Sequence, residues 1–190
     1  MKRLPILPTV IVAAAVAAMI GLGIWQLQRL HWKVALLARY AAAQGQPPIA
    51  FPTTPDPRNP PLFRRASAMC EHVIGWRSQT GYNLKEEVGY AHIASCRSGA
   101  EGPGFQAVIG WSATPTHPAW AGGMVSGVIA PDRDHVVKLV AASAAPGLQP
   151  VKPPSLENVP NNHLAYAIQW FFFAATAAVI YLLALRRRSR

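Results

Sequence analysis

The chain has 190 residues, of which 51% are hydrophobic, and it carries a formal net charge of +10. The mean hydropathy of +0.16 is high for a soluble globular domain, so membrane segments are sought first. The charge does not indicate a nucleic-acid partner, because much of it lies at the two ends and the rest of the chain is only mildly basic. These terminal basic residues are Lys2, Arg3, Arg186, Arg187, Arg188 and Arg190. Such a distribution is typical of a membrane protein whose ends lie beside anionic lipid.

An uncharged run between Arg3 and Arg29 predicts the first membrane span. It is long enough to cross a hydrocarbon core of about 30 Å as a helix. It is also longer than the apolar core of a cleaved signal peptide, which has about 7–15 residues. Good helix formers continue beyond Arg29 as far as Gly45. We therefore expect residues 1–45 to form an N-terminal transmembrane helix with an extracytoplasmic helical extension.

A second uncharged run, between Glu157 and Arg186, predicts a C-terminal transmembrane helix with a basic cytoplasmic tail over residues 162–190. The tail "RRRSR" follows the run at once, and the positive-inside rule places such a tail in the cytoplasm. Two spans then place the N-terminus there as well. Arg29, Lys33 and Arg39 oppose this orientation more weakly. We expect the region between the spans to be extracytoplasmic.

The region between the spans divides by composition. Residues 46–66 are rich in proline and predict an extended linker, and residues 143–161 predict a second linker. Residues 67–142 contain five β-like runs separated by turn signals such as "TGYN" and "PDRD". The runs are at 72–77, 90–96, 105–111, 124–130 and 135–142. The fold class expected is a membrane-anchored α+β protein, with two transmembrane helices flanking a small, mainly antiparallel extracytoplasmic β domain.

The two cysteines, Cys70 and Cys96, both lie in the predicted extracytoplasmic domain. That compartment permits disulfides, and a cross-link would stabilise a small domain, so a disulfide is the first interpretation. Two unrelated buried thiols are the second. A metal site with His72 and His92 is the third, because the Cys-His spacing does not match a standard zinc pattern.

The sequence contains no ordered catalytic motif. There is no G-x-S-x-G, no phosphate-binding glycine loop and no H-E-x-x-H. The histidines of the β domain, including His117 and His135, have no assigned role. We therefore do not expect an enzyme.

The first span ends in a motif that combines aromatic and polar residues, "GIWQLQRLHWK". Trp25, Arg29 and Trp32 share one helix face, and Gln26 and Lys33 follow the adjoining stripe. An interfacial aromatic belt with snorkelling cations explains the tryptophans and the arginine. It does not explain Gln26 beside the apolar side of the helix.

The second span begins with a similar motif, "NNHLAYAIQW". Asn161 or Asn162 is a suitable N-cap. His163, Tyr166 and Trp170 then share one face. A belt explains the two aromatic residues but leaves the histidine, and an ionisable residue at membrane depth suggests a function.

The predicted topology places both motifs at the outer membrane surface. A pocket there would suit a planar ligand stacked on the aromatic side chains, with His163 binding iron and Arg29 and Lys33 pairing with propionates. A haem fits this chemistry. From the residues alone, the aromatic belt remains the preferred interpretation.

The two motifs also resemble the two signatures of the Surfeit-locus-one family of cytochrome c oxidase assembly factors. The N-terminal match is G-x-W-Q-x-x-R-x-x-W-K, from Gly23 to Lys33, and the second is "NNHLAYAIQWF". The segment "AVIGWSATP" keeps Gly110 and Trp111 of a family strand but lacks an Asn-Arg pair before them.

The resemblance implies a non-enzymatic chaperone of the respiratory chain that binds haem a and aids its placement in the large catalytic subunit of the oxidase. His163 matches the proposed haem ligand. Trp25, Gln26, Arg29, Lys33, Tyr166 and Trp170 are the remaining candidate cofactor-binding residues. The expected partners are that subunit, other oxidase subunits and the lipid membrane, with no nucleic acid. The expected location is a bacterial-type inner membrane. The alternative is a structural accessory subunit that stays bound to the oxidase or a respiratory supercomplex, and a membrane-anchored enzyme is the third possibility.

Overall fold

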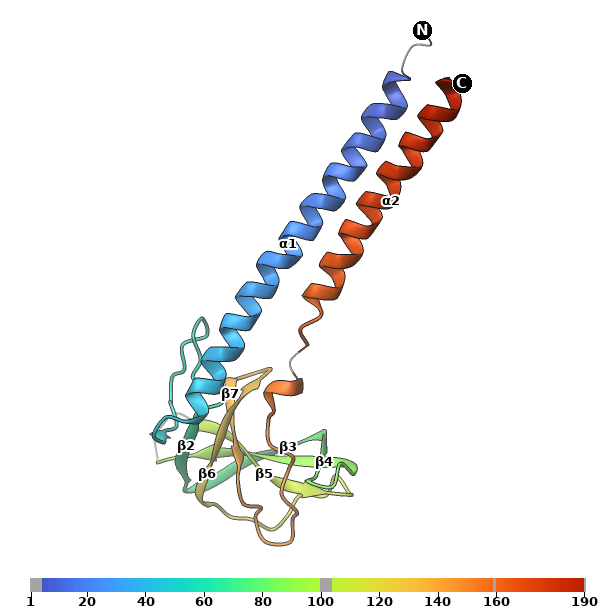
Figure 1. Ribbon diagram of the computed structural model, residues 1–190. Helices are drawn as coiled ribbons and strands as arrows, with labels where there is room; N and C mark the ends of the chain where they lie inside the picture. Colours follow the sequence, from blue (N-terminus) through green and yellow to red (C-terminus); the bar gives the residue numbers. More distant parts are fainter. Residues whose placement is uncertain (1–4, 100–103, 159, 190) are drawn as a thin grey trace. The chain divides into compact units, whose positions relative to one another are not determined.

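A computed structural model describes residues 5–99, 104–158 and 160–189. The chain divides into two compact units, which are considered separately (Figure 1). One unit comprises residues 1–37 and 159–190 and contains most of the first long helix and the whole of the second. The other comprises residues 38–158 and contains the β-sheet.

Two long apolar helices make up the first unit, α2 (His163–Ser189) and most of α1 (Ile6–Gln44), whose residues 38–44 belong to the second unit. Each contains an 18-residue window apolar enough to cross a membrane, with mean hydropathies of 2.3 and 2.0, and each window is 6% buried. Large apolar side chains on these helices are exposed, which suits contact with lipid. The prediction of two membrane-span helices flanking a β domain is confirmed. The side of the membrane on which each end lies stays a prediction.

The less exposed residues of α1 recur every three or four positions and form one stripe along the helix. As far as Lys33, this stripe consists of Thr9, Val12, Val16, Met19, Gly23, Gln26, Leu30 and Lys33, with Leu27 half-buried beside it. A matching stripe on α2 consists of His163, Ala167, Trp170, Ala174, Ala177, Tyr181 and Leu185. This spacing is that of two helices packed along a common seam. Gly and Ala within the stripes are typical of helix contacts in membranes, where small residues let backbones approach.

The second unit contains a single seven-stranded sheet in the order β1-β2-β6-β7-β5-β4-β3. Its strands are β1 (Ile49–Ala50), β2 (Arg65–Cys70), β3 (His72–Tyr82), β4 (Val88–Arg97), β5 (Gly104–Ser112), β6 (Gly123–Asp132) and β7 (Val136–Ala141). The pairs β1–β2 and β5–β7 are parallel and the other four are antiparallel.

The five strands predicted from the sequence are confirmed as β3 to β7. The structure adds β2 and the short β1, which lies within the proline-rich segment. The prediction of a turn at "TGYN" was wrong over Thr80–Tyr82, which belong to β3, because these residues pair with Val88–Tyr90 of β4. The sequence "RASAMC" of β2 was missed because it has few β-branched residues, and tertiary pairing with β6 determines its conformation.

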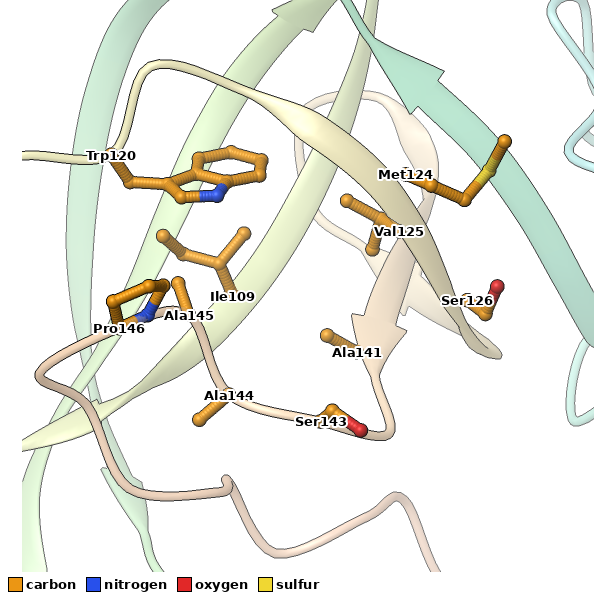
Figure 2. Close-up of a pocket in the computed structure, with 10 residues that line it drawn as sticks. All are labelled: Ile109, Trp120, Met124, Val125, Ser126, Ala141, Ser143, Ala144, Ala145 and Pro146. Atoms are coloured by element: carbon orange, nitrogen blue, oxygen red, sulfur yellow. The ribbon is translucent and has the colours of Figure 1, made fainter.

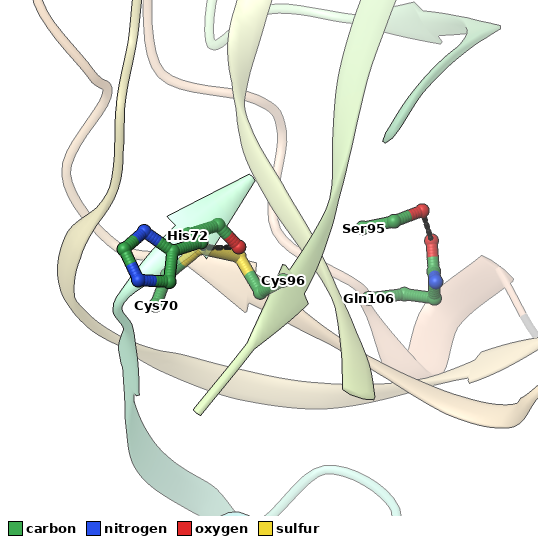
Figure 3. Close-up of a disulfide and its surroundings, with 5 residues drawn as sticks. All are labelled: Cys70, His72, Ser95, Cys96 and Gln106. Carbon is green, nitrogen blue, oxygen red and sulfur yellow. Dashed lines mark hydrogen bonds between the residues drawn. A yellow bond between two sulfur atoms is a disulfide. The ribbon is translucent and has the colours of Figure 1, made fainter. Parts of the chain in front are cut away.

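The larger hydrophobic core lies on one face of the sheet and includes Ile109, Ile129 and Leu139. The disulfide between Cys70 and Cys96 crosses this core and joins β2 to β4, which are not neighbours in the sheet (Figure 3). The backbone N–H of Glu71 also donates to the carbonyl of Arg97, at 2.9 Å. The sheet therefore curls until β2 and β4 meet. The predicted disulfide is confirmed, which excludes the free thiols and the Cys-His metal site.

A smaller apolar cluster lies apart from this core and includes Ile93, Val108 and Val140. Val151 packs against it, from the segment that leads towards α2. This segment is held by backbone bridges from Gln149 to Trp111 and from Val151 to Asn83. The predicted second linker is therefore partly a structural element of the sheet domain.

Candidate functional site

The most direct contact between the two sequence motifs is a hydrogen bond between Gln26 of α1 and His163 of α2. Gln26 Oε1 lies 2.8 Å from His163 Nδ1. Both residues are half-buried and lie on the stripes along which the two helices face each other. The structure therefore brings together the two residues that an aromatic belt leaves unexplained.

The chemistry of this bond fixes which nitrogen of the ring is protonated. An amide oxygen only accepts hydrogen bonds, so His163 donates from Nδ1–H. In the neutral ring, Nε2 then carries the lone pair, which is the atom that binds a metal. Within the part of the chain that the structure describes, Nε2 has no hydrogen-bond partner. The chemistry of this donor would suit a nitrogen ligand of haem iron.

Gly23 lets the helices approach one turn from Gln26. It is the buried residue of α1. A Cβ atom at this position would lie 2.7 Å from two ring atoms of Phe171 in α2. Ala167 of α2 is likewise buried, with 1% of its surface exposed. Small residues on both helices therefore allow close packing near the Gln26–His163 contact.

Two further candidate residues lie on the same stripes as this pair. Lys33 is seven residues beyond Gln26, and Trp170 is seven residues beyond His163, so each lies about two turns along its helix. Both are half-buried. The ring of Trp170 makes an edge contact with Phe173, at 6.3 Å between centroids.

The remaining candidates lie on exposed faces of the helices. Trp25 and Tyr166 are about half exposed. Arg29 is exposed, and its guanidinium lies 4.7 Å from the ring centre of Trp32, in a cation–π contact. These four residues suit an interfacial belt as well as they suit a ligand wall.

The start of α2 agrees with the expectation of an asparagine cap. The carbonyl of Asn162 accepts from the N–H of Tyr166 at 3.2 Å, so Asn162 occupies the N-cap position. Asn161 Oδ1 is buried and has no hydrogen-bond partner among the described residues. Asn161, two residues before His163, therefore has a hydrogen-bond acceptor that no described residue uses.

The histidine cluster of the sheet domain has a structural explanation. His92 is fully buried, and its Nε2 lies 2.8 Å from Ser112 Oγ. Burial lowers the pKa of His92, and the nearby charge of His117 lowers it further, against a raising contribution from the Thr114 backbone. The ring is therefore kept neutral inside the domain. Among the described residues, no group of three or more His, Cys, Asp or Glu could hold a metal ion.

The sheet domain also has an open hollow of about 310 Å³ (Figure 2). Trp120 lies over Ile109 at one side, and the segment Ser143–Pro146 forms the other. The side chains that line it are apolar, apart from the hydroxyls of Ser126 and Ser143 and the indole N–H of Trp120. No charged side chain lines it. This hollow offers no set of groups for acid–base or nucleophilic chemistry.

Comparison with known proteins assigns the family. A comparison with individual curated proteins gives no match. The family model of the SURF1 family matches residues 13–175, which include both helix motifs and the whole sheet domain. This family is one of assembly factors and is not a known class of enzymes. The chain therefore belongs to the SURF1 family, which is known for the assembly of cytochrome c oxidase.

Proposed function

We propose that this chain is an oxidase assembly factor that binds haem a through His163 and aids its placement in the large catalytic subunit of cytochrome c oxidase. Membership of the family supports the role in assembly. The observation that supports the cofactor is the contact between Gln26 and His163, which leaves Nε2 with a free lone pair on the seam of the hairpin. His163 would hold a bound haem, which would supply the iron atom.

Lys33 supports an anionic, haem-like ligand in particular. It lies on the same stripe of α1 as Gln26, whereas Arg29 lies on an exposed face against Trp32. Lys33 would pair with a propionate, and Trp170 would lie against the apolar part of the ligand. Arg29 and Trp25 would contribute less.

The proposed location is a bacterial-type inner membrane with the sheet domain outside the cytoplasm. The disulfide between Cys70 and Cys96 supports this side of the membrane, because disulfides persist in oxidising compartments. The basic residues in the last turn of α2, Arg186 to Arg188, support a cytoplasmic C-terminus.

The experiment is the absorbance spectrum of the full-length protein purified from cells that make haem a. Wild-type protein should carry a Soret band. His163→Ala should remove or shift that band without changing expression, because alanine is an excellent helix former. His31→Ala is the matched control, since His31 is an exposed histidine of α1, and it should leave the band unchanged.

Two results would contradict the cofactor role: a wild-type protein without haem, or a His163→Ala spectrum identical to the wild type. Stoichiometric co-purification of the haem-free protein with mature, active oxidase would then favour the accessory subunit. That subunit would use the exposed aromatic faces of α1 and α2 as helix contacts.

A further inference from the structure

We propose that Gln26 is a positioning residue that fixes the tautomer of His163, so that Nε2 rather than Nδ1 is presented to a ligand. The purpose of this positioning rests on the proposed function, in which Nε2 of His163 binds haem iron. Its geometry stands independently, because it concerns two side chains of the protein itself. Gln26 would not touch the ligand and would act only through the imidazole ring.

The hydrogen bond determines both the proton position and the ring orientation. A neutral histidine in water favours the Nε2–H tautomer, in which Nε2 cannot bind a metal. The 2.8 Å bond to Gln26 Oε1 requires the opposite tautomer, with the proton on Nδ1. It also fixes the orientation of the ring by holding Nδ1, the ring nitrogen nearer the backbone. Metal-binding histidines are commonly oriented in this way by a second hydrogen bond.

The half-buried position of Gln26 strengthens its hydrogen bond to His163. Both side chains are half-buried on the seam, where water competes less for the hydrogen bond than at an exposed site. Gly23, one turn away, lets α2 come close, because its missing side chain leaves room for Phe171. The glycine and the glutamine of the first motif therefore act on the same element, the beginning of α2.

The choice of an amide also sets the electronic character of the histidine. A carboxylate in this position would draw the Nδ1 proton more strongly and make Nε2 a stronger donor to iron. An aliphatic side chain would give no hydrogen bond. Glutamine lies between these cases, which suits a ligand that must hold a cofactor and later release it.

The first test uses the full-length protein without haem, in detergent, with ¹⁵N-labelled histidine. The ¹⁵N spectrum distinguishes the two neutral tautomers of His163, whose signal is assigned by its absence in His163→Ala. Wild type should show the proton on Nδ1, and Gln26→Leu should shift the signal towards the Nε2–H tautomer. Gln26→Glu keeps an acceptor and should retain the wild-type tautomer. Gln28→Leu, at an exposed glutamine of the same helix, should change nothing.

The second test adds ferric protoporphyrin IX to the same proteins, reduces it, and measures the iron–histidine stretching frequency by resonance Raman. The frequency should rise in Gln26→Glu and fall in Gln26→Leu. Affinity in Gln26→Leu should fall by about 10- to 100-fold, as for loss of other such hydrogen bonds. A purely structural role would weaken binding in both variants without moving the frequency in opposite directions.

Two outcomes would overturn the inference: an Nε2–H signal for His163 in the wild type, or a tautomer that is unchanged in Gln26→Leu. If neither the wild type nor any variant binds porphyrin iron, although the wild type shows Nδ1–H, the proposed haem function fails. The positioning of His163 by Gln26 would stand in that case, so the two failures are distinguishable.

Discussion

Gly23 shows how one residue without a side chain determines a contact between two membrane helices. Helix association in lipid depends on close packing, because lipid tails are as apolar as most side chains. The Phe171 ring fills the space that a Cβ atom at Gly23 would occupy. The neighbouring glycine, Gly21, has nothing within 4 Å of an added Cβ and lies on the exposed face.

We predict that Gly23→Ala destabilises the helix hairpin by about 1–3 kcal/mol through overpacking against Phe171. Gly21→Ala is the control and should be neutral or stabilising by up to about 1 kcal/mol, because alanine favours the helix. Thermal unfolding of the detergent-solubilised protein measures both. In the double variant Gly23→Ala/Phe171→Ala, the cost of the glycine change should disappear. Equal melting temperatures for Gly23→Ala and Gly21→Ala would refute the contact.

Asp132 is a single carboxylate that ties several strands together. Its side chain is 1% exposed and lies 2.8 Å from Arg77 of β3 and 3.4 Å from Lys138 of β7. Burial raises its pKa, but hydrogen bonds from Arg77 and His135 and the charges of Arg77 and Lys138 outweigh this and hold the pKa at about 2. The folded protein therefore favours the ionised form more than the unfolded chain does.

We predict that this carboxylate stabilises the sheet domain above about pH 4, and that the contribution is lost as the pH falls towards 2. The shift from 3.8 to about 2 corresponds to about 2 kcal/mol. Asp132→Asn should remove this part of the pH dependence and lower the free energy of unfolding at neutral pH. Asp134→Asn is the control, because Asp134 pairs with Arg77 but is 57% exposed. Urea unfolding, followed by tryptophan fluorescence, tests both, and an unchanged pH profile in Asp132→Asn would contradict the assignment.

At the scale of the elements, the sheet domain is closed by a link between strands that do not pair. Cys70 ends β2 and Cys96 lies near the end of β4, at a sequence separation of 26. The two strands are separated in the sheet by β6, β7 and β5. The disulfide thus maintains the curl that encloses the larger core.

We predict that Cys70→Ser and Cys96→Ser each lower the stability of the sheet domain by about 3 kcal/mol, as expected for a loop of this length. The double variant should resemble either single variant, because each removes the same bond. Chemical denaturation with and without reductant measures the effect. Mass spectrometry of unreduced, alkylated protein should find no free thiol, and two alkylated cysteines would contradict the pairing.

At the scale of the whole molecule, orientation in the membrane determines which compartment the site faces. The predicted arrangement has both ends in the cytoplasm and the sheet domain outside. It rests on the basic residues in the last turn of α2 and agrees with a disulfide in the domain.

We predict that a reporter enzyme active only outside the cytoplasm works when it is inserted after Gly99 and fails when it is fused after Arg190. The insertion site lies between β4 and β5, outside both strands. A reporter that is active only in the cytoplasm should give the opposite pattern at the two positions. Activity of the first reporter at Arg190 and not at Gly99 would show that the topology is the reverse of the predicted one. The Gln26–His163 pair would then lie at the cytoplasmic surface.

Local sequence patterns were sufficient to predict the two spans, the five central strands and the two helix motifs. Long uncharged runs leave few alternatives to a helix in a membrane, and alternation with turn residues marks strands within a few residues. The same local patterns identified His163 and Gln26 as residues that an aromatic belt does not explain. Compartment and domain size were enough to favour the pairing of Cys70 with Cys96.

Which of these residues contact one another depends on packing between distant segments of the chain. Gln26 and His163 are 137 residues apart, and their contact depends on the relative register and rotation of two helices, which no local pattern contains. The same rotation leaves Trp25 and Arg29 on exposed faces, whereas Lys33 lies on the less exposed stripe that also carries Gln26. Strand β2 likewise exists because β6 supplies its hydrogen-bonding partners. The physical reason is common to all of these cases: local sequence sets backbone preference and amphipathic faces, whereas side-chain partnership follows from packing between segments distant in the chain.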